Sequence, residues 1–284
     1  MSDPISMPAS HLFSHKAMNT TFLLRICEDD EAIARGMARE CFEQLDFLET
    51  RLSRFVDGSD VSRINHMRTG EILYISQPTH ECLLIALDAH QRTGGLFDIT
   101  LGQRIEHRKS GDDGPAPDLA GKIIIHPDVP AVTCEEPGRE IDLGGIGKGF
   151  ALDHLQQILI EWGADGALLA AGASSLLAFG PQPWPVELAG SGGSTRITLH
   201  NEALSASGTA IQGSHIIHPA GDAAMPAAPC DRVWVTARTA AQAEVWSTAL
   251  MLVDPEDIPD FIDGRESIGS VHLDCGGHIQ AITS

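Results

Sequence analysis

Apolar residues recur along this chain with two periods, one typical of helices and the other of strands. Over residues 31–52 they step by threes and fours from Ile33 through Cys41 to Leu52, as on one face of a long helix. Because helices and strands mix without a regular βαβ repeat, the pattern predicts an α+β fold. The remaining predicted elements are helices over 80–92, over 151–162 and from Thr239 onward, strands at 19–26, 167–172 and 233–236, and short strands and turns over 178–221.

Capping residues and glycines mark several element ends. Ser59 opens a short predicted helix over 59–65, and Thr239 with Gln242 fits a capping box. Gly163 is placed to end the helix over 151–162, and Gly276-Gly277 predicts a final hairpin. We expect one domain over 1–284, with a polar leader at 1–16 and a polar loop insertion at about 107–121.

The run from Ile141 to Phe150 carries four glycines within six residues, after a strand-like entry and before a predicted helix. Such a turn lets a phosphate approach backbone N–H groups at the positive end of a helix, and Lys148 adds a charge. Glycine-rich turns also occur without a ligand, so anion binding and a structural turn both stay open. The run is neither a Walker A loop, since no G-K-[ST] follows, nor a G-x-G-x-x-G fingerprint.

Composition narrows the classes of partner. The formal net charge is −20, from 39 acidic and 19 basic residues, which argues against nucleic acid or an anionic membrane as the main partner. An acidic chain that binds an anionic ligand needs local devices such as helix N-termini, a few placed cations or a metal.

Cysteine spacing and the N-terminus bear on the compartment. The six cysteines are scattered without a C-x-x-C pair, so buried reduced thiols are expected. The first residues show no apolar signal region. We expect a soluble protein, cytoplasmic by default, and leave a periplasmic or cell-envelope location open.

Oxygen donors gather on the helix that follows Thr239. Glu244, Ser247 and Thr248 sit at i, i+3 and i+4, which places a carboxylate and two hydroxyls on one face. Such donors suit Mg²⁺ or Ca²⁺ rather than zinc. From the spacing alone, a polar stripe on a core helix explains them better.

Two aspartates and two histidines have more than one interpretation. Asp142 either bonds the backbone of its own turn or contacts a ligand lying on the glycines. Asp98 follows Gly94-Gly95 in what could be a strand carrying it toward a pocket, or in a core strand after a helix end. In Ser214 to Pro219, His215 and His218 would point to opposite faces of a strand, which argues against joint metal binding. One histidine could act as a general base, although a lone histidine is more often a structural residue.

Taken together and in order, six segments resemble the ApbE family, the FAD:protein FMN transferases. They span nearly the whole chain. The family patterns MGTTF, S.F…S..S.LN, GGAFDITVG, IDLGGIAKGY, SHIIDP and ADALSTAL correspond here to residues 17–22, 52–65, 94–102, 141–150, 214–219 and 243–250.

The resemblance implies an α+β fold related to the T-fold, with mixed sheets flanked by helices and a ligand pocket between two halves. It implies Mg²⁺-dependent transfer of FMN from FAD to a Thr or Ser hydroxyl of an acceptor flavoprotein, with release of AMP. The partners implied are therefore FAD and that acceptor protein, while membrane contact is not indicated.

Site residues follow from the same resemblance, position by position. Glu244, Thr248 and the Gly145 carbonyl would hold the metal, with Ser247 as a neighbouring candidate. His215 would be the base on the acceptor hydroxyl. Residues expected to bind FAD are Asp142 and Lys148 beside the glycine turn, and Met18, Phe55, Leu96, Phe97, Asp98 and Ile217 around the flavin and adenine.

Some positions depart from the family pattern. Glu244 stands where Asp is usual, His218 replaces the Asp of SHIIDP, residues 101–105 lack the family's Pro, and 172–174 replace its Gly-Gly-Asp. Because these changes fall at ligand-facing motifs, three hypotheses remain: a divergent transferase, a non-catalytic FAD-binding module on the same fold, or an FAD pyrophosphatase in which water replaces the acceptor.

Overall fold

The computed structural model describes residues 9–111, 114–208, 216–227 and 229–282. Its largest element is an eight-stranded sheet in which each neighbouring pair is antiparallel. In spatial order its strands are β1 (Ser10–Ala17), β2 (Thr20–Cys27), β6 (Gly166–Ala171), β7 (Ser175–Phe179), β10 (Glu202–Gly208), β11 (Arg232–Ala237), β12 (Ile268–Cys275) and β13 (His278–Ile282).

Two smaller sheets complete the strands. One is β3-β5-β4 (Ile72–Tyr74, Ala131–Glu136, Lys122–Ile125), and the other is the β8-β9 hairpin (Trp184–Ala189, Ser194–Leu199). The helices are α1 (Glu31–Leu52), α2 (Asp60–Asn65), α3 (Gln77–Arg92), α4 (Gly102–Ser110), α5 (Gly147–Glu161), α7 (Ala240–Leu250), α8 (Ile258–Ile262) and the 3₁₀ turn η1 (Asp222–Ala224). The α+β class is thus confirmed.

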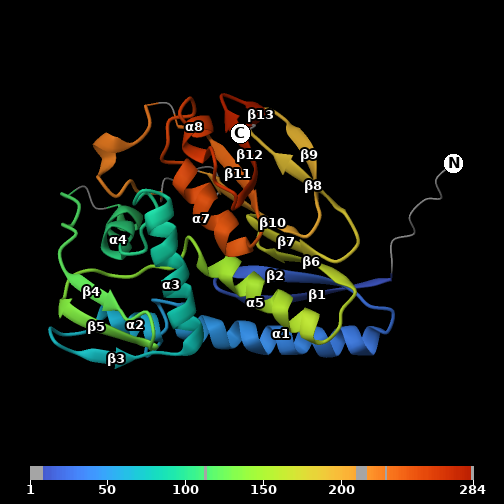
Figure 1. Ribbon diagram of the computed structural model, residues 1–284, viewed down its shortest axis with the longest axis horizontal. Coiled ribbons are helices and arrows are strands. Elements are labelled where there is room, and N and C mark those ends of the chain that lie inside the picture. Colours follow the sequence, from blue (N-terminus) through green and yellow to red (C-terminus); the bar gives the residue numbers. More distant parts are fainter. Residues whose placement is uncertain (1–8, 112–113, 209–215, 228, 283–284) are drawn as a thin grey trace.

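Helices α1, α5 and α7 pack with one another and with the long sheet, while α2, α3, α4 and the three-stranded sheet lie to one side (Figure 1). The main core joins both parts and includes Phe22, Leu48, Phe97 and Phe150. A separate cluster with Trp184 and Trp234 packs the β8-β9 hairpin against the long sheet.

Local signals placed most helices correctly. The Ser59 hydroxyl accepts the Ser62 N–H at the start of α2, and the Thr239 hydroxyl accepts the Gln242 N–H at the start of α7. At the end of α5, Gly163 adopts φ 81° and Ala164 N–H bonds back to Leu159 O, as expected of a glycine C-cap.

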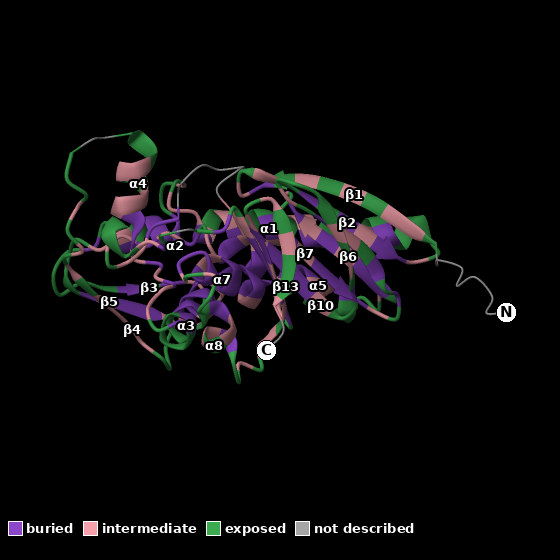
Figure 2. Cartoon of the chain, turned by 90° about the horizontal axis from the view of Figure 1, so that it is seen from above, coloured by how far each residue is buried: buried purple, intermediate pink, exposed green. Residues whose placement is uncertain are grey.

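Three predictions about local structure were wrong. The polar leader becomes a strand over its second half, since β1 pairs with β2 along its whole length and alternates between exposed and half-buried positions (Figure 2). Residues 97–101 and 141–143 are not strands; they run side by side with hydrogen bonds such as Asp142 N–H to Ile99 O, too few to make a ladder. The polar segment from 107 begins inside α4, whose last residue is Ser110.

The expectation for the cysteines was also wrong in part. Cys230 and Cys275 form a disulfide across neighbouring strands, whereas the other four cysteines are free and buried. The two residues lie 45 positions apart, and the register that pairs Arg232 with Asp274 brings them together. Spacing along the chain does not reveal such a pair.

Candidate ligand-binding site

A cavity of about 800 Å³ opens between the long sheet and the segment 96–109, which includes most of α4. That volume is within the range of small-molecule sites. Its wall is formed by the β1-β2 turn, the end of α1, the segment 96–109, the glycine turn, the β6-β7 turn, the end of β10, the start of β11 and one face of α7. Most of the expected site residues thus meet in one place, although they come from distant parts of the chain.

The glycine turn leads directly into α5 at the cavity. Gly144, Gly145, Gly147 and Lys148 line the pocket, and among the described residues no side chain caps the start of the helix. Backbone N–H groups at such an end have no intrahelical partner and attract anions. The turn therefore keeps the features needed to hold a phosphate.

Asp142 proves to be a structural brace of this turn. Its Oδ1 accepts the Gly144 N–H at 2.7 Å, the backbone-bonding interpretation of the sequence. Its Oδ2 lies 3.3 Å from Nη1 of Arg54. Both carboxylate oxygens thus have protein partners, although Asp142 also lines the cavity.

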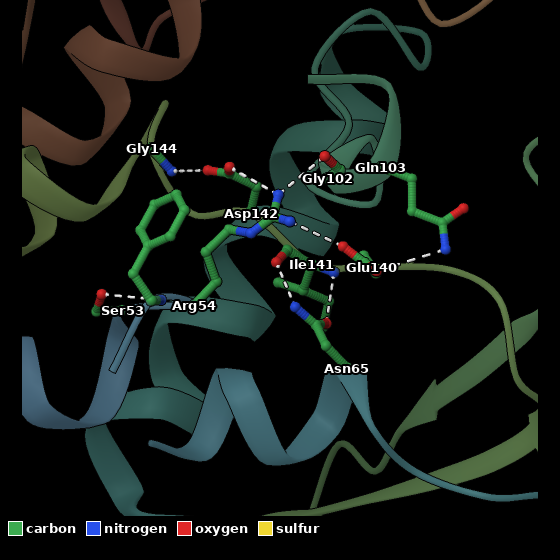
Figure 3. Close-up of polar contacts among 10 residues, drawn as sticks. Ser53, Arg54, Asn65, Gly102, Gln103, Glu140, Ile141, Asp142 and Gly144 are labelled. Carbon is green, nitrogen blue, oxygen red and sulfur yellow. Dashed lines mark hydrogen bonds and ion pairs between the residues drawn. The ribbon is translucent and has the colours of Figure 1, made fainter. Parts of the chain in front are cut away.

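Arg54 and Glu140, which the sequence did not single out, complete this braced wall of Arg54, Glu140, Asp142 and Gly144 (Figure 3). Arg54 Nη2 lies 2.8 Å from Glu140 Oε2, and Nη1 donates to the Gly102 carbonyl at 2.9 Å. Nothing local in the sequence signals the contact, because residues 54 and 140 are 86 positions apart.

A second group of polar residues lies on α7, β7 and β10, and we call it the hydroxyl wall. Of its members, Ser207, Glu244 and Thr248 line the cavity, and Ser175 and Ser247 support them through hydrogen bonds. Glu244 is 3% exposed, and its Oε1 accepts the Ser175 hydroxyl at 2.5 Å and lies 3.2 Å from Lys148 Nζ. Its Oε2 is buried and has no hydrogen-bond partner among the described residues. A buried carboxylate oxygen without a donor calls for a cation or a further donor there.

The neighbouring hydroxyls are organised differently. Ser207 lies 3.2 Å from Thr248 Oγ1 and 2.9 Å from Ser247 Oγ. Thr248 lines the cavity close to Gly145, since a Cβ built on that glycine would lie 3.8 Å from Thr248 Oγ1. Ser247 is fully buried, bonds back to the Glu244 carbonyl and lies behind the pocket wall.

These residues fit a hard divalent cation better than a transition metal. Glu244, Thr248 and the Gly145 backbone supply oxygen donors only, as Mg²⁺ prefers. Within the described residues, no three His, Cys, Asp or Glu side chains gather in a metal-binding group. A cation here would therefore rest on one carboxylate, with hydroxyl, carbonyl and ligand oxygens completing its shell.

The remaining expected residues divide between wall and support. Met18, Phe55, Leu96 and Ile217 line the cavity, and Phe55 is 70% exposed. Asp98 lines it too, but its Oδ1 accepts both the backbone N–H and the hydroxyl of Thr100.

Phe97 lines the cavity and packs under Gly145, where a Cβ would meet its ring at 3.1 Å. His215 lies outside the described residues. Two wall cations, Lys109 on α4 and Arg232 on β11, were not anticipated.

Asp153 joins the two helices behind the site. Its carboxylate accepts the N–H groups of Ala240 at 2.7 Å and Ala241 at 3.0 Å, at the start of α7. Burial raises its pKa to about 7, the two N–H groups oppose the shift, and Glu244 adds to it. Protonation of Asp153 is thus linked to the stability of the contact between α5 and α7, which we call the seam.

Fold and pocket together define an α+β ligand-binding protein whose site combines a glycine-turn anion cradle, a lysine and an oxygen-only donor set. The chain belongs to the ApbE family, whose model matches residues 18–271.

Curated relatives carry one name. FAD:protein FMN transferase from Salmonella typhimurium is 24% identical, over 90% of this chain and 82% of its own. The protein of that name from Buchnera aphidicola subsp. Schizaphis graminum is 26% identical, over 74% of this chain and 71% of its own.

Solved structures agree on the fold. The flavin transferase ApbE from Vibrio cholerae superposes with a TM-score of 0.81 at 19% identity, covering 97% of this chain and 98% of its own. The ApbE protein from Thermotoga maritima gives 0.80 at 21% identity, covering 96% and 97%.

Proposed function

We propose that this protein is an FAD:protein FMN transferase that moves FMN from FAD to a Thr or Ser hydroxyl of an acceptor protein and releases AMP, with Mg²⁺. Family membership and the names of the relatives support the activity. The observation that carries the metal requirement is the buried, unpartnered Oε2 of Glu244 on a wall of oxygen donors.

The chain's own residues suit binding of the donor. The N–H groups at the start of α5 and the Lys148 ammonium would take the pyrophosphate, since both attract anions. Met18, Phe55, Leu96, Phe97 and Ile217 offer apolar surface for the rings. Asp98 would support this wall through its bonds to Thr100.

Glu244, Thr248 and the Gly145 carbonyl would hold Mg²⁺, with Ser247 as support from behind. The metal would supply neutralisation of the charge on the transferring phosphate. Glu244 is one methylene longer than the usual Asp, and Ser175 and Lys148 fix its Oε1, which leaves Oε2 as the donor.

In the reaction, the acceptor hydroxyl oxygen bonds to the FMN phosphorus while the bond from that phosphorus to the bridging oxygen breaks. AMP leaves with the bridging oxygen, and the hydroxyl proton goes to a base, for which His215 remains the candidate. Positioning and charge neutralisation supply most of the rate in such transfers.

One contact favours the alternative of a non-catalytic FAD-binding module. Lys148 Nζ already lies 3.2 Å from Glu244 Oε1, so a cation is present without a metal. A module of this kind would bind FAD without divalent ions and release no AMP.

The test is FAD turnover with and without Mg²⁺, in the presence of a panel of Thr- and Ser-containing peptides, followed by mass spectrometry. We expect AMP and a flavinylated peptide from the wild type, and a loss of at least about 10–100-fold in Glu244→Ala. Unchanged turnover in Glu244→Ala would overturn the metal assignment.

Other outcomes separate the alternatives. Free FMN beside AMP identifies a pyrophosphatase, and metal-independent FAD fluorescence quenching without AMP identifies the binding module. Products that appear only in Glu244→Asp would mean that the transfer chemistry has lapsed in this chain.

Compartment is part of the proposal as well. No described helix is long and apolar enough to cross a membrane. The Cys230–Cys275 disulfide is typical of oxidising compartments and weighs against the cytoplasm. Alkylation of free thiols in intact cells tests this. If Cys230 and Cys275 are both recovered as alkylated thiols, the disulfide is absent in the cell and the cytoplasm is favoured.

A further inference from the structure

Arg54 lines the cavity, but its terminal nitrogens are engaged by protein acceptors around the glycine turn. It follows the last residues of α1, and its two terminal nitrogens reach three acceptors, the Gly102 carbonyl and the carboxylates of Glu140 and Asp142 (Figure 3). Its side chain is 12% exposed, and that of Asp142 is 10% exposed. The contact is therefore largely shielded from water, where charge-assisted hydrogen bonds are strong.

The chain of contacts continues into the turn. Arg54 holds Asp142 Oδ2, and Asp142 Oδ1 in turn accepts the Gly144 N–H. The next residue, Gly145, is placed between the Phe97 ring and Thr248. Glycines have wide conformational freedom, so a turn of this composition needs such an external brace to keep one shape.

We propose that Arg54 is a positioning residue that, through Asp142, sets the glycine turn in the conformation that binds FAD and presents the Gly145 carbonyl. The expected changes in kinetics rest on the proposed function. The expected change in the conformation of the turn does not.

A direct role of Arg54 as a phosphate ligand fits the geometry less well. Nη1 and Nη2 are both engaged by protein acceptors, and two carboxylates surround the single guanidinium. The pair of acids leaves the cluster with a net negative charge, which does not favour an anion. The planar fork of arginine is needed to reach all three acceptors, and a lysine ammonium does not reproduce it.

The experiment compares Arg54→Met, Arg54→Lys, Asp142→Asn and the double variant Arg54→Met/Asp142→Asn. Arg35→Met is the matched control, because Arg35 on α1 also pairs with a carboxylate, that of Glu31, but at the exposed surface. Gly102→Ala tests the same contact from the other side, since its Cβ would lie 2.9 Å from Arg54 Nη1 and 2.7 Å from the Glu140 carbonyl.

Three readouts are taken on the full-length protein: FAD affinity by fluorescence, kcat and KM for Mg²⁺-dependent AMP release, and amide hydrogen exchange over residues 143–148 without ligand. We expect Arg54→Met and Asp142→Asn each to lower kcat/KM by roughly tenfold or more, and exchange in the turn to rise. The double variant should lose no more than the worse single variant, because both act through one contact. Arg54→Lys should recover little.

Independent losses that multiply in the double variant, or exchange in the turn equal to that of Arg35→Met, would overturn the proposal. If the wild type releases no AMP, the proposed function fails, but FAD affinity and hydrogen exchange still decide the role of Arg54. If Arg54→Met does not fold, Asp142→Asn and Gly102→Ala carry the same comparison; normal exchange in both would equally overturn it.

Discussion

The two walls of the pocket differ in how completely their polar groups are satisfied. On the braced wall, the carboxylate oxygens of Asp142 and the terminal nitrogens of Arg54 all have protein partners. On the hydroxyl wall, Glu244 keeps one buried oxygen without a partner among the described residues. Under the proposed function, the satisfied groups would hold the shape of the site and the unsatisfied oxygen would bind the metal.

At constant pH, the largest change in stability is expected at the close approach of α5 and α7. A Cβ on Gly149 would lie 2.4 Å from the Ala240 carbonyl oxygen, so Gly149→Ala must push the helices apart. We expect a loss of about 1–3 kcal/mol in the free energy of unfolding, measured by urea denaturation.

Gly36→Ala is the matched control on α1. There the added Cβ meets only the Trp162 ring at 3.5 Å, an ordinary contact, so the same substitution should stabilise by about 0.5–1 kcal/mol. Equal effects at the two sites would show that the seam between α5 and α7 is not tightly packed.

Lys148→Met tests whether the hydroxyl wall serves binding. Removal of the ammonium leaves Glu244 Oε1 with the Ser175 hydroxyl as its one partner among the described residues, and it removes a positive charge beside the glycine turn. We expect FAD affinity to fall roughly tenfold, about the value of one charge-assisted hydrogen bond.

The measurement is a fluorescence titration of Lys148→Met with FAD, and Lys122→Met is the matched control. Lys122 pairs with Glu135 at the surface of the small sheet, away from the cavity, and its loss should leave affinity unchanged. Similar affinities for the two variants would remove Lys148 from the site.

The last expected effect, spread over several pH units, is a pH dependence of stability at the same contact between α5 and α7. Because the folded state raises the pKa of Asp153 from 3.8 to about 7, it binds that proton more tightly than the unfolded chain. The resulting stabilisation is complete below about pH 4 and is lost as pH rises through about 7, with a slope below about 1.4 kcal/mol per pH unit.

Asp153→Asn isolates this contribution, since the amide oxygen can still accept an N–H from α7 but does not titrate. Urea unfolding between pH 4 and 8 should give a difference between wild type and variant that shifts in favour of the variant with rising pH. A constant difference would mean that Asp153 keeps an ordinary pKa.

Spacing along the chain was enough to group Glu244, Ser247 and Thr248 on one helix face and the glycines in one turn, whereas their assignment to a ligand came from the family resemblance. Glu244 and Thr248 are one helical turn apart, and the glycines lie within one loop. What sequence reasoning missed joins distant segments: Ser175 and Glu244 are 69 positions apart, and Arg54 and Asp142 are 88 apart. The spacing of apolar residues indicates which face of an element is buried, but it does not indicate which polar groups from distant elements contact one another.

The same limit explains the errors in secondary structure. Residues 97–101 and 141–143 are apolar enough to be predicted as strands, but residues 99–100 form a turn, and the two segments share only a few hydrogen bonds and join none of the three sheets. Residues 10–17 lacked an apolar signal because β1 is an edge strand with one face in solvent. In both cases the secondary structure was decided by which segments lie beside the residues in the folded chain, and the local sequence does not reveal that.

The β1-β2 turn places competing demands on one residue. Met18 and Asn19 both have positive φ, of 49° and 57°, in a two-residue hairpin turn for which asparagine and glycine are the natural choices. Met18 nonetheless lines the pocket with a long thioether side chain. Replacing Met18 with glycine or asparagine should therefore stabilise the hairpin turn but remove apolar surface from the pocket. Asn19→Gly should reduce the backbone strain of the turn while Met18 stays in the pocket wall.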